Sequence, residues 1–141
     1  MIKKSVTYKD FLGQTRTDTF RFNLTEDEMM DLIKEDEIFS TDHVSYVMET
    51  RDAIEMYRIL RRMILASYGV LSEDGRFFRK PPEALYDFAH SAAYTQLLDE
   101  LVDTDDFNKL RSFIMGIIPA KYAERLDENP QVAALTTEVV G

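Results

Sequence analysis

Two histidines are the first residues in this sequence whose chemistry could support catalysis or metal binding. They are His43 and His90, and neither has a histidine or carboxylate at the i+3 or i+4 position that would form a helical metal-binding pair. We interpret both as surface or helix-end histidines. A metal-dependent activity that is lost when either histidine is substituted would contradict this interpretation.

Two acidic clusters could in principle bind a hard cation through oxygen ligands, namely Glu26-Asp27-Glu28 and Asp103-Thr104-Asp105-Asp106. Both precede apolar stripes with helical spacing, where acidic and hydroxyl side chains cap helices. The sequence holds 26 acidic residues, so close pairs are expected without any catalytic role. The five glycines form neither phosphate-binding pattern, G-x-x-x-x-G-K or G-x-G-x-x-G. We therefore predict no enzyme activity, cofactor or metal.

The composition limits the partners that the chain can have. With 17 basic and 26 acidic residues the formal net charge is −9, which disfavours binding to nucleic acid and to anionic lipid. There is no cysteine, so disulfides, thiolate nucleophiles and cysteine zinc sites are excluded, and a reducing cytoplasm is the expected compartment. We see no export signal and no stretch of roughly 20 apolar residues that would span a membrane.

The first 24 residues alternate in type and predict a β-hairpin. Lys3 to Tyr8 and Thr15 to Leu24 are the expected strands, with a turn at residues 9–13. Because a hairpin alone is marginally stable, we expect its Phe20 and Phe22 to dock on helices. Thr25 and Glu28 have the spacing of a capping box and predict a short helix there.

Helical spacing accounts for most of the remaining chain. The strongest pattern predicts a helix from Arg51 to Tyr68 that ends at Gly69, with two apolar faces. The face with Met56, Ile59 and Met63 needs a cover, which leads us to expect self-association, although another copy, a client or the hairpin could provide it. Further helices are predicted around 43–49, after Pro81-Pro82, over 94–102, and over 107–118 up to Pro119.

We consider three apolar groups as candidate contacts with a protein partner. Methionine suits surfaces that accept imperfectly matched partners, and Phe77 and Phe78 stand in the polar connector 70–80. Core packing is the alternative for each group. The candidates are Met56, Ile59, Met63, Phe77, Phe78, Phe107, Leu110, Phe113 and Ile117.

These patterns predict a mainly α fold of about five or six helices with an N-terminal β-hairpin. We expect one domain over residues 1–119, with the hairpin at 1–24, followed by a flexible tail at 120–141.

Several stretches in order resemble the tail assembly chaperones of long-tailed bacteriophages. They are the hairpin leading into Phe20-Arg21-Phe22-Asn23-Leu24-Thr25, then Ser67-Tyr68-Gly69, Ser72-Glu73-Asp74-Gly75-Arg76-Phe77-Phe78-Arg79-Lys80, Ala93-Tyr94 with Leu97 and Glu100-Leu101, and Phe113-Ile114-Met115-Gly116-Ile117-Ile118-Pro119.

The resemblance implies a helical protein without enzymatic activity that binds the tape measure protein and keeps it soluble until tail tube assembly. It also implies a longer form, made by ribosomal frameshifting, that recruits tail tube protein. Such a chaperone acts in the host cell cytoplasm and is not expected in the mature virion. A structural tail-completion or connector protein retained in the virion is the alternative.

Overall fold

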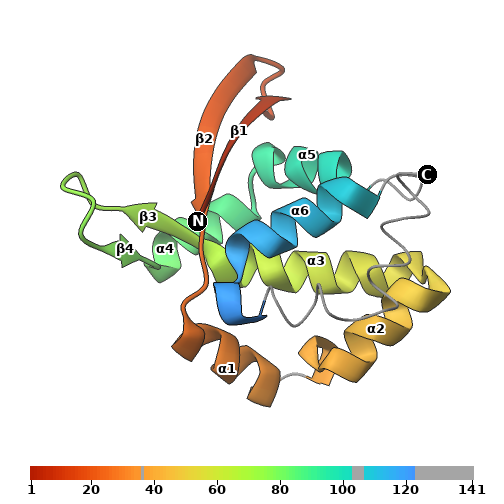
Figure 1. The fold of residues 1–141 in the computed structure, drawn as a ribbon. Helices are drawn as coiled ribbons and strands as arrows, with labels where there is room; N and C mark the ends of the chain where they lie inside the picture. Colours follow the sequence, from red (N-terminus) through yellow and green to blue (C-terminus); the bar gives the residue numbers. More distant parts are fainter. Residues whose placement is uncertain (36, 103–106, 123–141) are drawn as a thin grey trace.

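The computed structural model describes residues 1–35, 37–102 and 107–122 of the 141-residue chain. This described part forms a four-stranded antiparallel sheet, six α-helices and one 3-10 turn (Figure 1). The predicted flexible tail at 120–141 falls outside the described residues from 123 onward, and the predicted cap at Thr104-Asp105-Asp106 falls outside them as well. Residues 120–122 are helical.

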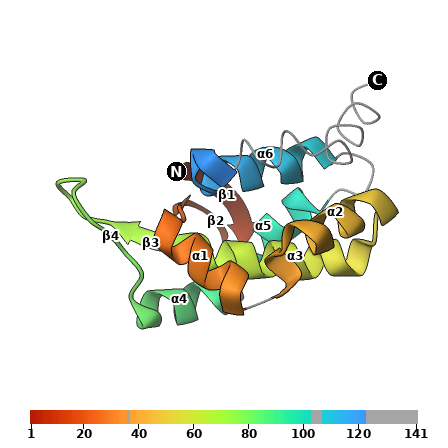
Figure 2. The ribbon, with the colours of Figure 1, turned by 60° about the horizontal axis from the view of Figure 1, so that its bottom comes forward.

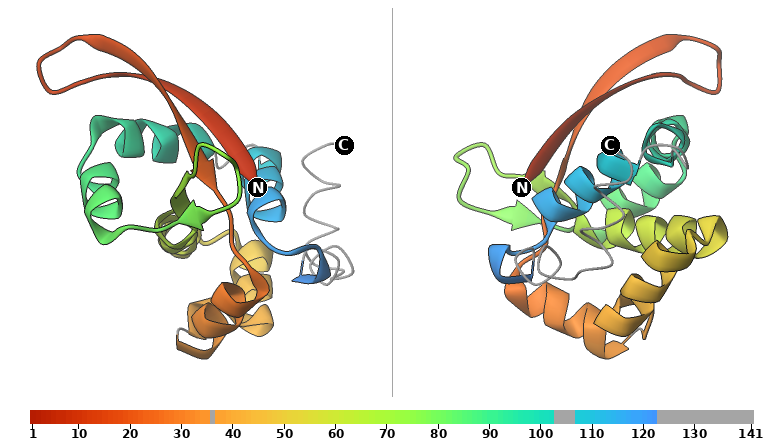
Figure 3. Two further views of the ribbon diagram at one scale, coloured as in Figure 1. Left: turned by 90° about the vertical axis from the view of Figure 1, so that its left-hand side faces the viewer. Right: turned by 45° about the vertical axis from the view of Figure 1, so that its right-hand side comes forward.

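The N-terminal hairpin is confirmed. Strand β1 (Ile2–Lys9) pairs with β2 (Thr15–Phe22) over their whole length, from Ile2 opposite Phe22 to Lys9 opposite Thr15. Asp10 fixes the turn because its carboxylate accepts hydrogen bonds from the backbone N–H groups of Leu12 and Gln14, both at 2.9 Å. The hairpin projects beyond the helices as an arm (Figure 3).

The prediction of a mainly α fold is wrong, because the sheet extends beyond the hairpin into a mixed fold of helices and sheet. Strand β3 (Tyr68–Leu71) pairs with β2, and β4 (Phe78–Arg79) pairs with β3, giving the order β1-β2-β3-β4. Both strands fall where we expected a helix end and a connector. At four and two residues they are too short to show the alternation that identifies a strand in a sequence.

Gly69 therefore has a different role from the one predicted. The helix ends at Tyr68 in extended conformation, φ −61° and ψ 139°, and the chain continues directly into β3. A Cβ atom at Gly69 would lie 2.6 Å from Cε2 of Phe78 and 2.8 Å from the carbonyl oxygen of Arg79. Glycine is required here by the close approach of β4 and not by a left-handed helix end.

The first helices follow their capping residues. Helix α1 (Glu26–Glu35) starts with the predicted capping box, in which Thr25 N–H donates to Glu28 at 3.1 Å and Glu28 N–H donates to Thr25 at 3.2 Å. The 3-10 turn η1 (Glu37–Phe39) leads into α2 (Thr41–Thr50), whose first turn donates from His43 N–H to the hydroxyl of Ser40.

Helix α3 (Ala53–Ser67) is the central helix, and Asp52 caps it by accepting a hydrogen bond from Glu55 N–H at 3.1 Å. It is followed by α4 (Pro82–Ala89), α5 (Ala92–Leu101) and α6 (Phe107–Ile117). Figure 2 shows α1 and α2 in front of α3, with α6 above them. Met56, Ile59 and Met63 are all buried within this single chain, so the face that they form does not need a second copy as its cover.

The hairpin docks on the helices through its aromatic residues, as predicted. Phe22 is fully buried, and its ring centroid lies 5.3 Å from that of Phe113 and 5.9 Å from that of Phe88. Phe20 contacts the Phe88 ring at 5.0 Å. This aromatic cluster joins the sheet to α4 and α6, and it holds the base of the arm rigidly against the helical part.

Candidate functional site: an apolar groove

An apolar groove of about 200 Å³ is lined by residues of α1, η1, α2, α3 and α6 and of the segment that follows α6. Helices α1 and α2 lie on the side of α3 away from the hairpin tip (Figure 1). Four α-helices and η1 contribute its walls, together with the last described residue. The groove is defined by Met29 and Ile33 of α1, Phe39 of η1, Val44 and Met48 of α2, Ile59 and Met63 of α3, and Ile114, Ile118 and Tyr122.

Lys80 connects the start of α1 to two neighbouring segments of the chain. Its ammonium group donates to the carbonyl oxygens of Asn23 and Ala66, each at 2.9 Å, and to the carboxylate of Glu28. Burial raises the pKa of Glu28, but the hydrogen bonds from Lys80 and Thr25 outweigh it and leave the pKa below its ordinary value. One cation therefore connects the end of β2, the start of α1 and the end of α3.

A second polar contact fixes α2 beside α3. The imidazole Nε2 of His43 lies 3.2 Å from the carboxylate of Glu55, which also lies 3.5 Å from Arg58. Arg51, between the two helices, has φ 54°, and this left-handed residue reverses the chain direction. These contacts set the spacing of the two helices that form one wall of the groove.

The chemistry of the groove is limited to packing. Nine of its ten residues have apolar side chains, and Tyr122 supplies the single hydroxyl. A cavity of about 150 Å³ with aliphatic walls is large enough for a benzene ring, so this groove can take one or two apolar side chains. Met29, Met48 and Met63 have flexible, polarisable side chains that can adapt to different shapes.

The structure separates the predicted partner-binding residues into three groups. All of the described candidates on α3 and α6 are buried in the core, and of these Ile59 and Met63 also line the groove, whereas Met56, Leu110, Phe113 and Ile117 do not. Phe77 is 49% exposed on the β3–β4 hairpin, and Phe78 packs over Gly69. The side chain of Phe107 lies outside the described residues. A binding role for these residues remains a prediction.

Sequence reasoning did not assign the other walls of the groove to partner binding. Met29 and Ile33, like Val44 and Met48, are spaced four residues apart, which is the signal of an apolar helix face. Apolar residues have the same helical spacing whether they line a groove or fill a closed core, so the spacing does not predict which of the two they form. The distinction depends on how five segments meet.

The two histidines serve structural contacts. His43 pairs with Glu55, and Nδ1 of His90 lies 2.7 Å from the carbonyl oxygen of Tyr86 in the preceding helical turn. Within the described ranges, no three His, Asp or Glu side chains come together as a metal-binding group. None of the helices in that part of the chain combines the length and hydrophobicity needed to cross a membrane.

The comparison with known proteins agrees with a site built for protein contact. A family described as phage tail assembly chaperone has a model that matches residues 1–140. No curated protein and no solved structure gives a significant match to this chain. The family match covers both the hairpin arm and the helices that form the groove. The chain therefore belongs to the phage tail assembly chaperone family.

Proposed function

We propose that this chaperone binds the tape measure protein through the apolar groove and keeps it soluble until tail tube subunits assemble around it. The observation that carries the proposal is a partly open, almost wholly apolar groove with three methionines in its walls. Such a groove fits one or two apolar side chains on the apolar face of an amphipathic client helix. The role needs no catalysis, in agreement with the chaperone family.

The charge of the residues beside the groove predicts the charge of the residues that border the apolar face of the client helix. The sequence segment 26–50, within which α1, η1 and α2 lie, includes nine acidic residues but only Lys34 and His43 as basic residues. An acidic rim favours a client helix whose apolar face is bordered by lysine or arginine. Binding should weaken as ionic strength rises, because most of these acidic residues within the described ranges are exposed.

Ile33 offers a test that leaves the core untouched. It lines the groove, yet it is 36% exposed, so Ile33→Glu should fold normally while placing a charge at the groove entrance. Ile54→Glu is the matched control, because Ile54 is 80% exposed on α3 and is not part of the groove. Loss of one apolar contact of about 1.5–3 kcal/mol predicts roughly 10- to 100-fold weaker client binding for Ile33→Glu.

The measurement is co-expression with the tape measure protein, followed by quantification of soluble client and of the complex on gel filtration. Wild type and Ile54→Glu should keep the client soluble, and Ile33→Glu should not. An insoluble client with the wild-type chain contradicts the chaperone role. Equal behaviour of the two variants contradicts the groove as the binding site.

We also propose that the protein acts in the host cytoplasm and leaves before the particle is complete. A longer frameshifted form would recruit tail tube protein to the same complex. Mass spectrometry of purified virions should therefore find no peptides of this chain. Abundant peptides would instead favour a tail-completion or connector protein that stays in the virion.

A further inference from the structure

The outer edge of strand β2 is open over most of its length. β2 pairs with β1 along all eight of its residues, but it pairs with β3 only at Arg21 and Phe22. Within the described part of the chain, no strand lies beside residues 15–19 on this side, and all five of these residues are exposed. β1, in contrast, has α5 packed against it. Within the described residues, positions 15–19 of β2 therefore have an edge without a strand partner, as does the outer side of β1, where α5 packs.

Two hydrogen bonds show which backbone groups of β2 face outward. Asn23 N–H donates to the carbonyl of Ser67 at 2.9 Å, on the β3 side of the strand. Because successive residues of a strand point their N–H and C=O groups to opposite edges, the groups of Thr15, Thr17 and Thr19 point to that same side. They form a template for another antiparallel strand.

The side chains along this edge are complementary to themselves. Residues 15–19 read Thr-Arg-Thr-Asp-Thr, which is symmetric about Thr17 in every respect but the sign of its two charges. In antiparallel pairing with an identical strand centred on Thr17, Thr15 lies opposite Thr19 and Arg16 lies opposite Asp18. Every cross-strand pair is then either threonine with threonine or a cation with an anion.

We propose that two copies of this chain associate through antiparallel pairing of their β2 strands about Thr17. The pairing is isologous, with a two-fold axis at Thr17, and it joins the two sheets into one. Thr15, Thr17 and Thr19 provide about six backbone hydrogen bonds across the new edge. Arg16 and Asp18 fall in the intervening positions, where side chains of facing strands approach most closely.

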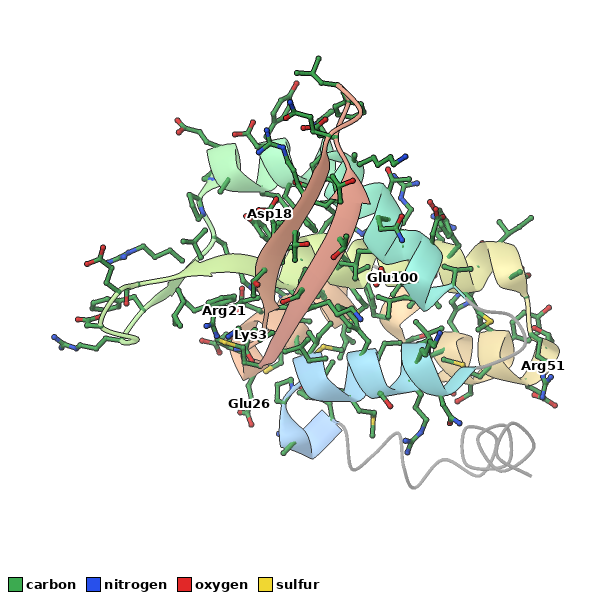
Figure 4. The ribbon with its side chains drawn as sticks, turned by 90° about the horizontal axis from the view of Figure 1, so that it is seen from above. Lys3, Asp18, Arg21, Glu26, Arg51 and Glu100 are labelled. Atoms are coloured by element: carbon green, nitrogen blue, oxygen red, sulfur yellow. The ribbon has the colours of Figure 1, made fainter. Side chains whose placement is uncertain are left out.

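Contacts within the hairpin already hold these two charges in place. Nε of Arg16 lies 2.6 Å from the Asp10 carboxylate, and the Tyr8 hydroxyl donates to Asp18. All four side chains lie on the same face of the hairpin, given the pairing of Tyr8 with Arg16 and of Val6 with Asp18. Figure 4 shows Asp18 and Arg21 along this strand. Preorganised charges lose little conformational freedom when a partner strand arrives.

Pairing of two β2 strands about Thr17 would also give a contact to two apolar residues that are exposed in the single chain. Phe11 and Leu12 at the hairpin tip are 83% and 86% exposed. Pairing about Thr17 places Gln14 of one copy opposite Phe20 of the other, which brings the tip to the place where β2 and β3 separate. A hollow of about 440 Å³ lies there, lined by Asp18, Thr19, Phe20, Arg21, Tyr68, Gly69, Val70 and Leu71. The apolar tip can cover the half-exposed Val70.

A single cysteine tests the register directly, because the chain contains no cysteine of its own. Thr17→Cys places two thiols opposite each other across the axis, with Cα atoms about 5.5 Å apart, a separation that a disulfide spans. Thr7→Cys is the matched control, since Thr7 pairs with Thr17 but lies on β1. Under mild oxidation, Thr17→Cys should form at least about tenfold more covalent dimer than Thr7→Cys.

Charge reversal supplies a second measurement on the reduced protein, without any client. Arg16→Asp and Asp18→Arg should each shift the chain toward monomer in analytical ultracentrifugation, and the double variant should recover dimer. Circular dichroism confirms that each variant is folded. Equal cross-linking of the two cysteine variants overturns the proposal, as does a monomeric wild type. A dimer that is insensitive to both charge reversals also overturns it, because it would use another surface.

Discussion

Lys80 carries more structural contacts than any pattern in the sequence suggests. Its side chain is 22% exposed, and its ammonium group contacts two backbone carbonyls and a carboxylate from segments far apart in the chain. In the sequence it is only the last residue of a polar connector. A single lysine forms no periodic pattern in a sequence. Its contacts exist only in the folded chain, where β2, α1 and α3 come together.

Substitutions at this contact should change stability in a pH-dependent way. The pKa of Glu28 is lowered in the folded chain, so its stabilising effect is present above the ordinary value of 4.5 and is lost as pH falls through the folded pKa. Glu28→Gln should cost about 1 kcal/mol at pH 7, a value reduced by partial solvent exposure, and the difference from wild type should vanish in acid.

Chemical denaturation from pH 7 down to pH 3 provides the measurement. Glu26→Gln is the control, because Glu26 lies in the same helical turn and is exposed (Figure 4). Lys80→Met should cost more than Glu28→Gln, since it leaves two carbonyls and a carboxylate without their donor. A Glu28→Gln deficit that persists unchanged at pH 3 would rule out the ionised contact.

At the scale of elements, the junction of α3 and β3 is where the fold departs from its expected class. A glycine after a strong apolar helix normally marks a left-handed helix end. Here the chain enters a strand without a turn, and β4 approaches so closely that no Cβ fits. Glycine can thus be required either by a left-handed backbone at a helix end or by the close approach of a neighbouring strand. The sequence alone does not distinguish these two requirements.

Two substitutions at Gly69 distinguish the conformational requirement from the steric one. Asparagine tolerates left-handed conformations, so Gly69→Asn would be mild if the residue ended a helix. The contact with Phe78 and Arg79 predicts instead that both Gly69→Ala and Gly69→Asn lose about 1–3 kcal/mol through overpacking. Thermal or urea denaturation checks this. A stable Asn variant beside an unstable Ala variant would restore the helix-end role.

Elements with strong local signals could be predicted from the sequence. The hairpin follows from alternation, α1 from the Thr25–Glu28 capping box, and α4 from its leading prolines. Strands β3 and β4 could not, because two to four residues hold too little periodicity. The groove could not be predicted either. All four of Ile59, Met63, Leu110 and Ile117 are equally periodic and buried, yet only Ile59 and Met63 line the groove.

At the scale of the whole molecule, the two proposed surfaces lie at opposite ends. The hairpin arm projects from one side of α3, and the groove helices α1 and α2 lie on the other (Figures 1 and 3). Charge is distributed in the same way. Residues 1–24 carry five basic and two acidic residues, and the strongly acidic 26–50 segment borders the groove. The hairpin segment is therefore net positive, whereas the segment that borders the groove is net negative.

This separation predicts that association does not block the client. A dimer cross-linked through Thr17→Cys should bind two client helices, because each groove remains open and faces away from the axis. Native mass spectrometry of the cross-linked dimer with a client peptide measures the stoichiometry. One peptide per dimer would show that the arms cover a groove, which would contradict the arrangement of the two surfaces.

The methionines of the groove are buried, at 8% exposure for Met29 and Met48 and 2% for Met63, which shields their sulfur atoms from oxidants. Without cysteine, methionine is the main oxidisable residue of the chain, and three of its seven methionines, Met29, Met48 and Met63, form groove walls. A sulfoxide would place a polar group in a proposed binding site whose walls are almost wholly apolar. Burial should therefore protect client capture from peroxide, which should oxidise the exposed Met1 and Met30 first.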